Sequence, residues 1–211
     1  KKAQNAPDAG TQAHEKHKML QILKVPGVKP VLLAFFCYCS LEVTAGLWAS
    51  SYLVLNRGIA EEAAAKMASL FYLGITAGRF LSGFASGKLG DRRMVRLGQA
   101  LAVVGLLLLL LPLGEAALYA GLTVAGLGCA PIFPSLLHAT PDNFGKARSQ
   151  TIMGMQMAGA YTGSTLSPLL FGAFAGGGLI AMYPYFLLFF MAVMVFLSER
   201  ASRVCVGEAL S

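Results

Sequence analysis

Residues 87–96 read GKLGDRRMVR, a short basic connection between two long apolar runs at residues 63–87 and 93–113. A helix that crosses the hydrocarbon core of a bilayer needs about 20 mostly apolar residues, and both runs reach that length. Gly87 and Gly90 beside the charges favour a turn. The stretch therefore predicts two membrane-spanning helices joined by a tight turn, with the charged side chains held at one membrane surface.

Long apolar runs separated by polar breaks continue along most of the chain. The 211 residues are 56% hydrophobic and 13% charged, with a mean hydropathy of +0.63. A soluble chain is about a quarter charged, so a soluble domain of this composition would lack the polar surface to cover itself. We predict an all-α membrane protein with six transmembrane helices, at residues 30–55, 63–87, 93–113, 116–138, 148–175 and 178–198.

The six helices are expected to form one bundle over residues 29–199. Residues 1–28 are mostly polar at their start and contain no apolar signal segment, so we predict a cytoplasmic linker that resembles the inside of a longer chain. Residues 200–211 are predicted to be a cytoplasmic tail.

The basic residues predict the orientation of the bundle. Fourteen of the 17 Lys and Arg residues fall in the linker, the tail and two loops that six helices would place on one side. Because cytoplasmic loops accumulate positive charge, we predict a plasma (inner) membrane protein with both termini in the cytoplasm. The net charge of +7 then reflects topology, and no nucleic-acid partner is expected. The fourteen are Lys1, Lys2, Lys16, Lys18, Lys24, Lys29, Lys88, Arg92, Arg93, Arg96, Lys146, Arg148, Arg200 and Arg203.

Glu42 is an acidic residue near the middle of the first predicted helix. A charged side chain at that depth costs about 2.5–3.5 kcal/mol, so such residues usually face a cavity, a partner or a proton path. Tyr38 lies one helical turn earlier on the same face. We interpret Glu42 and Tyr38 as substrate-binding residues, with Glu42 as a carrier of the coupling ion; a structural glutamate that locks two helices together is the alternative.

Arg79 lies inside the second predicted helix at a comparable depth. Counted at 1.5 Å per residue, Glu42 is about 18 Å and Arg79 about 12 Å from the cytoplasmic end of its helix. An arginine side chain can cover the difference of about 6 Å. The sequence therefore suggests a Glu42–Arg79 charge pair. An equal alternative is that Arg79 extends to the cytoplasmic surface or pairs with a residue of the missing half.

Three further polar or aromatic side chains complete the predicted substrate site: Trp48, Thr76 and Gln156. Side chains of these types suit a polar ligand such as a sugar. Gln156 could instead make an interhelical hydrogen bond, and Trp48 could belong to an interfacial aromatic belt. No nucleotide-binding loop, nucleophile elbow or metal-ligand spacing is found, so no catalytic residues, metal site or cofactor are predicted.

Glycines recur four residues apart in the second and fifth predicted helices. This spacing lets helix backbones approach closely. The similar positions of the two helices also suggest a weak three-plus-three repeat, although glycine-rich helices resemble one another by chance. The spaced pairs are Gly74 and Gly78, Gly83 and Gly87, Gly159 and Gly163, and Gly172 and Gly176.

The stretch at residues 87–96 resembles the signature of the major facilitator superfamily, Gly-x-Leu-x-Asp-Arg-x-Gly-Arg-Arg, which joins the second and third helices of each six-helix half. Positions 94 and 95 depart from it, with Met and Val where the family has Gly and a basic residue. Degenerate forms are more usual in the second half of family members. The matching residues of this cytoplasmic loop motif are Gly87, Leu89, Asp91, Arg92 and Arg96.

Two further stretches, residues 126–134 and 156–164, resemble the fucose permease group of that superfamily, which contains sugar:proton symporters. The resemblance implies a twelve-helix fold of two bundles around a central cavity, of which this chain is the C-terminal half. Its first and fourth helices would line the cavity and bring Tyr38, Glu42 and Trp48 near the substrate. The N-terminal six-helix half and the lipid bilayer would be its partners.

We therefore expect a secondary active transporter, not an enzyme, that moves a sugar or similar small polar solute by alternating access. The coupling ion would be a proton or sodium. A drug or metabolite efflux transporter of the same superfamily and a non-transporting membrane scaffold or sensor are the alternatives. A membrane-embedded enzyme is disfavoured because it would need a cluster of His, Asp or Ser residues at one depth. Away from their ends, the predicted spans hold one Glu and one Arg, Glu42 and Arg79, and His138 lies at the end of one helix.

Overall fold

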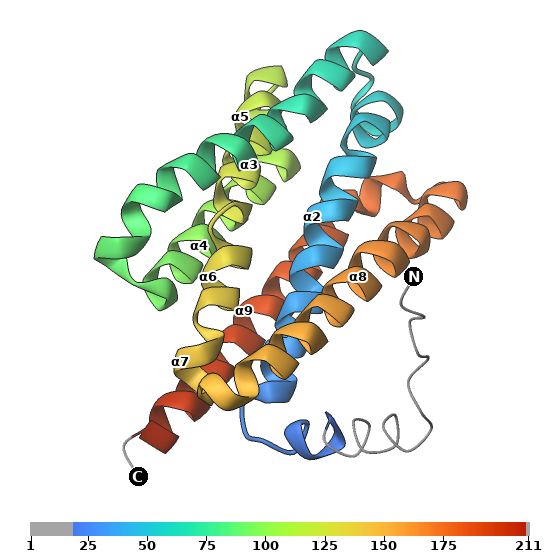
Figure 1. Cartoon of the computed structure of the whole chain (residues 1–211). Coiled ribbons are helices and arrows are strands. Elements are labelled where there is room, and N and C mark those ends of the chain that lie inside the picture. The colour runs from blue at the N-terminus through green and yellow to red at the C-terminus, as the bar shows by residue number, and fades with distance from the viewer. Residues whose placement is uncertain (1–18, 210–211) are drawn as a thin grey trace, which may run out of the picture.

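The computed structural model describes residues 19–209, with side chains described to residue 205, and this part of the chain consists of helices joined by short connections (Figure 1). Residues 1–18 of the predicted linker and the end of the predicted tail lie outside the described residues. The elements are α2 (Val28–Arg57), α3 (Glu61–Leu89), α4 (Asp91–Leu110), α5 (Glu115–Cys129), α6 (Ile132–His138), α7 (Thr140–Phe144), α8 (Lys146–Gly176), the 3₁₀ turn η1 (Ile180–Met182) and α9 (Tyr183–Ala209).

Four segments within the described residues are long and apolar enough to cross a membrane: Val28–Arg57, Asp91–Leu110, Glu115–Phe144 and Ile180–Cys205. Helices α3 and α8 have 29 and 31 residues but do not reach that hydropathy. Charged residues at their ends and many Gly and Ser residues lower it. The structure thus establishes four candidate spans, and the predicted count of six is not confirmed.

The predicted helix bounds differ from the observed ones mainly at the breaks. Pro131 separates α5 from α6, yet its neighbourhood keeps right-handed helical backbone angles, so the segment bends without unfolding. Pro168 lies inside a continuous α8. Pro184 occupies the first turn of α9, where a missing N–H is tolerated. The last helix continues to Ala209, through most of the predicted tail.

The helices form two groups, with α3, α4 and α5 on one side and α2, α8 and α9 on the other (Figure 1). Within the first group, Gly74 and Gly78 of α3 face the backbone of α5. A Cβ at Gly74 would collide with the carbonyl oxygen of Thr123, and one at Gly78 would lie 2.8 Å from that of Leu127. Only glycine permits this separation of the two helices, which confirms the close approach predicted for this pair.

Hydroxyl groups connect α2 to α8 in the second group. Thr44 and Ser167 are buried and their hydroxyl oxygens are 3.0 Å apart. The Ser167 hydroxyl also donates to the carbonyl oxygen of Ser40 at 3.3 Å. Gly163 lies against the carbonyl of Phe36 and allows the helices to meet there. Because a membrane interior offers no water, each such bond satisfies a group that would otherwise be unpaired.

Candidate functional site

Glu42 and Arg79 lie opposite each other where α2 and α3 meet. The Arg79 Nη2 atom is 3.9 Å from Glu42 Oε1, and the two side chains are 60% and 21% exposed. The distance exceeds that of a hydrogen bond, so this is an ion pair held through space. The arginine is the accessible partner, whereas the carboxylate is mostly enclosed by its neighbours.

Two tyrosines surround the carboxylate of Glu42. Tyr38 is 1% exposed and its hydroxyl donates to the carbonyl oxygen of Cys129 at 2.9 Å, which ties α2 to the end of α5. The ring of Tyr72 lies over Gly46, where any larger residue would collide with the hydroxyl. Both hydroxyls are close enough to Glu42 to interact with its charge. The acid therefore lies in a partly polar enclosure between α2, α3 and α5.

The other predicted substrate-binding residues are committed to contacts within the protein. The indole N–H of Trp48 donates to the carbonyl oxygen of Pro168 at 3.2 Å, and its ring packs edge-on against Phe171. Gln156 is fully buried, and its amide N–H donates to the Thr140 hydroxyl at 2.9 Å. Thr76 is exposed, and its hydroxyl donates to the carbonyl of Tyr72 in its own helix. The structure thus groups Tyr38, Glu42 and Arg79, while Trp48 and Gln156 serve the α2–α8 and α7–α8 interfaces.

The predicted loop motif forms the turn between α3 and α4. Gly90 has φ of 74°, a left-handed value that favours glycine, and it links Leu89 directly to Asp91 at the start of α4. Asp91 Oδ2 is 2.7 Å from His138 Nδ1 at the end of α6. The turn is therefore attached to the end of the bent α5–α6 segment.

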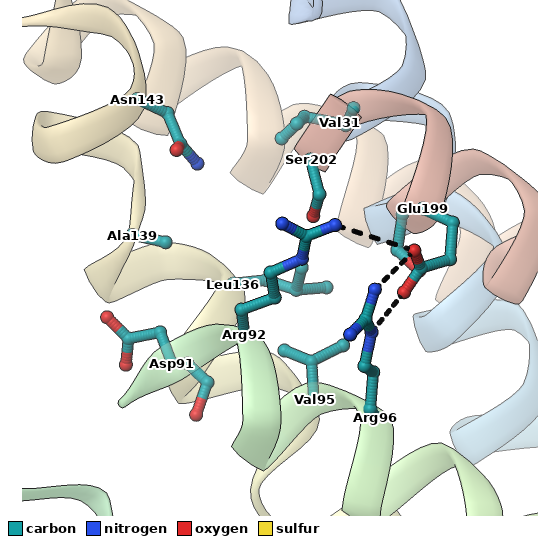
Figure 2. Close-up of a pocket in the computed structure, with 13 residues that line it drawn as sticks. Val31, Asp91, Arg92, Val95, Arg96, Leu136, Ala139, Asn143, Glu199 and Ser202 are labelled. Atoms are coloured by element: carbon teal, nitrogen blue, oxygen red, sulfur yellow. Dashed lines mark hydrogen bonds and ion pairs between the residues drawn. The ribbon is translucent and has the colours of Figure 1, made fainter. Parts of the chain in front are cut away.

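Arg92 and Arg96 of the same motif face Glu199 of α9 (Figure 2). Arg96 makes a two-pronged contact, with Nη2 donating to Glu199 Oε2 at 2.7 Å. Arg92 Nη2 lies 3.8 Å from the same oxygen. These side chains and Asp91 line a small pocket. Figure 2 shows both guanidinium groups converging on the Glu199 carboxylate, on the opposite side of this pocket from Asp91. Two of the motif's basic residues thus connect α4 to α9.

Sequence reasoning did not assign a role to Glu199 or to His138. Glu199 directly follows the last apolar run of the sequence. The predicted topology places it at the cytoplasmic surface, where the basic residues of the motif are also expected. Pairing opposite charges at one predicted membrane surface would have identified it. Among the side chains described, those of residues 19–205, no group of three or more His, Cys, Asp or Glu is arranged to hold a metal ion.

The family model of the Major Facilitator Superfamily matches residues 31–204. This chain belongs to the major facilitator superfamily. The match covers all the helices from α2 to most of α9, including the loop motif and the Glu42–Arg79 pair. No curated protein matches the chain at a significant level.

Solved transporters share the fold at low sequence identity. A peptide transporter POT in complex with sulfate has a TM-score of 0.68 at 19% identity, over 83% of this chain and 38% of that one. A POT family transporter in complex with a thioalcohol-conjugated peptide has a TM-score of 0.68 at 15% identity, over 82% and 37% of the two chains. This chain therefore spans under two fifths of the length of these transporters. The particular resemblance to the fucose permease group is not confirmed by these matches.

Proposed function

We propose that this chain is the C-terminal half of a secondary active transporter that moves a sugar or similar small polar solute by alternating access. The observation that carries the proposal is the Glu42–Arg79 pair, with a separation of 3.9 Å and an arginine 60% exposed. Intramembrane charges of this kind usually belong to a solute or ion pathway. Membership in the superfamily and the partial coverage of complete transporters support the same proposal.

The complete protein would contain an N-terminal six-helix half that faces α3 across the central cavity. Under this proposal α3 and α8 also span the membrane, giving six spans, because 29 and 31 helical residues exceed the roughly 20 required. Their lower hydropathy then reflects polar faces turned toward the cavity and the partner half. The basic α3–α4 turn and both termini would lie in the cytoplasm of a plasma membrane.

Ion coupling would act through Glu42. An ionised Glu42 attracts Arg79 strongly in a medium of low dielectric constant, and protonation or a bound sodium ion removes that attraction. Arg79 would then be free to change position or to meet the solute. A protonated Glu42 could donate to the hydroxyl oxygen of Tyr38, whose own hydrogen is given to the Cys129 carbonyl.

Uptake measurements on the full-length parent in vesicles test this proposal. Glu42→Gln should lower ion-coupled uptake by at least about tenfold, because a glutamine neither binds the coupling ion nor carries a charge opposite Arg79. The matched control is Glu62→Gln, because Glu62 is exposed and forms an ion pair with Lys66 at the start of α3. The control should transport normally.

Uptake that is equal in the parent and in Glu42→Gln would remove Glu42 from the mechanism and leave it a structural residue. No uptake of any polar solute by correctly inserted protein would favour the efflux or scaffold alternatives.

A further inference from the structure

A cavity of about 940 Å³ opens beside Arg79, between the second half of α3 and the bent end of α6. Ligand pockets commonly have volumes of about 300–1,000 Å³ and a few polar groups on an apolar wall. Here the α3 wall presents Arg79, Ser82 and Ser86, and α6 presents Phe133 and His138. The cavity therefore has the size and mixed lining of a small-molecule site.

The backbone of α3 forms part of the cavity wall. Gly83 and Gly87 line it, and a Cβ at either position would meet no other atom within 4 Å. Both glycines lie on the same face as Arg79, Ser82 and Ser86, at intervals of three or four residues. One carbon atom could be added at either glycine without a clash, so the cavity is open directly beside this wall.

The guanidinium of Arg79 is the strongest unfilled donor in the cavity. Arginine has five N–H donors in a planar fork that fits a carboxylate. Its contact with Glu42 at 3.9 Å is too long for a hydrogen bond, and no hydrogen bond of its guanidinium is formed among the described residues. This predicts an anionic group on the solute, which would supply the missing acceptors.

Ser82 and Ser86 offer the complementary groups. Their hydroxyls donate to carbonyls of their own helix, of Arg79 at 3.0 Å and of Gly83 at 3.2 Å. The lone pairs of both oxygens therefore remain available as acceptors for solute hydroxyls. Along the helix axis the two serines lie about 4.5 and 10.5 Å beyond Arg79. A carboxylate at Arg79 with hydroxyl groups extending along α3 fits this order.

We infer that the solute is a hydroxylated organic acid, such as a sugar acid, whose carboxylate binds Arg79 and whose hydroxyls bind Ser82 and Ser86. This inference rests on the proposed transport function and names its substrate class. A neutral sugar would leave the donors of Arg79 unfilled. At the far end of the cavity, Asp91 is paired with His138, which disfavours a second carboxylate there and points to a monocarboxylate.

The test compares uptake of gluconate and glucuronate with that of glucose by the full-length parent in proteoliposomes. The inference expects the acids to be transported and Arg79→Gln to raise their KM by about 10- to 100-fold. Arg93→Gln is the control, because it removes the same charge at an exposed position. Arg93 lines neither this cavity nor the pocket of Figure 2. Glucose uptake that is unaffected by Arg79→Gln, without uptake of the acids, would overturn the inference and retain the proposed function.

A second variant separates loss of binding from loss of folding. Gly83→Leu places a branched apolar side chain in the cavity from a position where an added Cβ meets no atom within 4 Å, so it should insert normally and still reduce uptake of the acids at least tenfold. Gly176→Leu is its control. Gly176 also has open space around it, but it ends α8, whereas the cavity meets α8 near its beginning, at Met153. Full uptake by Gly83→Leu would contradict a solute site at this wall. If correctly inserted parent transports neither the acids nor glucose, both the inference and the sugar-like solute are wrong.

Discussion

In the first half of α3, Gly74 and Gly78 lie against the backbone of α5, whereas Gly83 and Gly87, with the same four-residue spacing, face open space. The same difference occurs on α8, where Gly163 lies against α2 and Gly176 has no neighbour within 4 Å. Spacing of small residues therefore permits close helix contact without requiring it. Along α3, the change from packed to open glycine marks the beginning of the cavity.

The packed glycines should be the most sensitive positions. In Gly74→Ala the added methyl group meets backbone atoms of Thr123 and Leu127, which cannot rotate away. Forced overpacking typically costs about 1–3 kcal/mol. Thermal unfolding of purified protein in detergent should show a clear loss of stability. If Gly74→Ala is as stable as the parent, the α3–α5 contact is looser than described.

The open glycines should respond in the opposite direction. Gly83→Ala adds a methyl group that touches nothing, and alanine in a helix interior is favoured over glycine by about 0.5–1 kcal/mol. The same unfolding measurement should show unchanged or slightly higher stability. A loss comparable to that of Gly74→Ala would mean that this half of α3 is covered, and the cavity would have to be abandoned.

The α2–α8 contact provides the smallest expected effect. Thr44→Val keeps the shape of the side chain and removes its bond with Ser167, for an expected loss of about 0.6 kcal/mol, the average for hydrogen bonds between membrane helices. Ser40→Ala is the informative comparison, because the Ser40 Oγ atom is buried without a hydrogen-bond partner in the described part of the chain. Its removal should cost no stability. Equal losses in both variants would show that packing, not the hydrogen bond, holds these helices together.

Most of the helical architecture could be predicted from hydropathy. Both ends of α2 and α4 lie within a few residues of the predicted ones, whereas α9 continues beyond its apolar run to Ala209. The predicted number of spans, six, differs from the four that hydropathy identifies on the observed helices. Polar residues that face the cavity, such as Arg79, lower the hydropathy of the helix that carries them. The short α7 was missed, since Thr140–Phe144 reads as a polar loop.

The site was predictable only where charge and depth determine position. Helix rise was enough to suggest that Glu42 and Arg79 lie at similar depths. In the structure, Arg79 Nη2 is 3.9 Å from Glu42 Oε1. Helix rotation cannot be obtained in this way. Trp48 and Gln156 were consequently compatible with a ligand site and with packing, and in the structure both make contacts with neighbouring helices.

Trp48 is the single tryptophan of the chain, and its indole is fixed by the Pro168 carbonyl and the Phe171 ring at the α2–α8 contact. Indole fluorescence responds to the polarity and hydrogen bonding around the ring. The chain therefore carries an optical probe at one defined contact. Any sliding of α2 against α8 during the transport cycle would register as a spectral shift in a parent whose other tryptophans have been replaced.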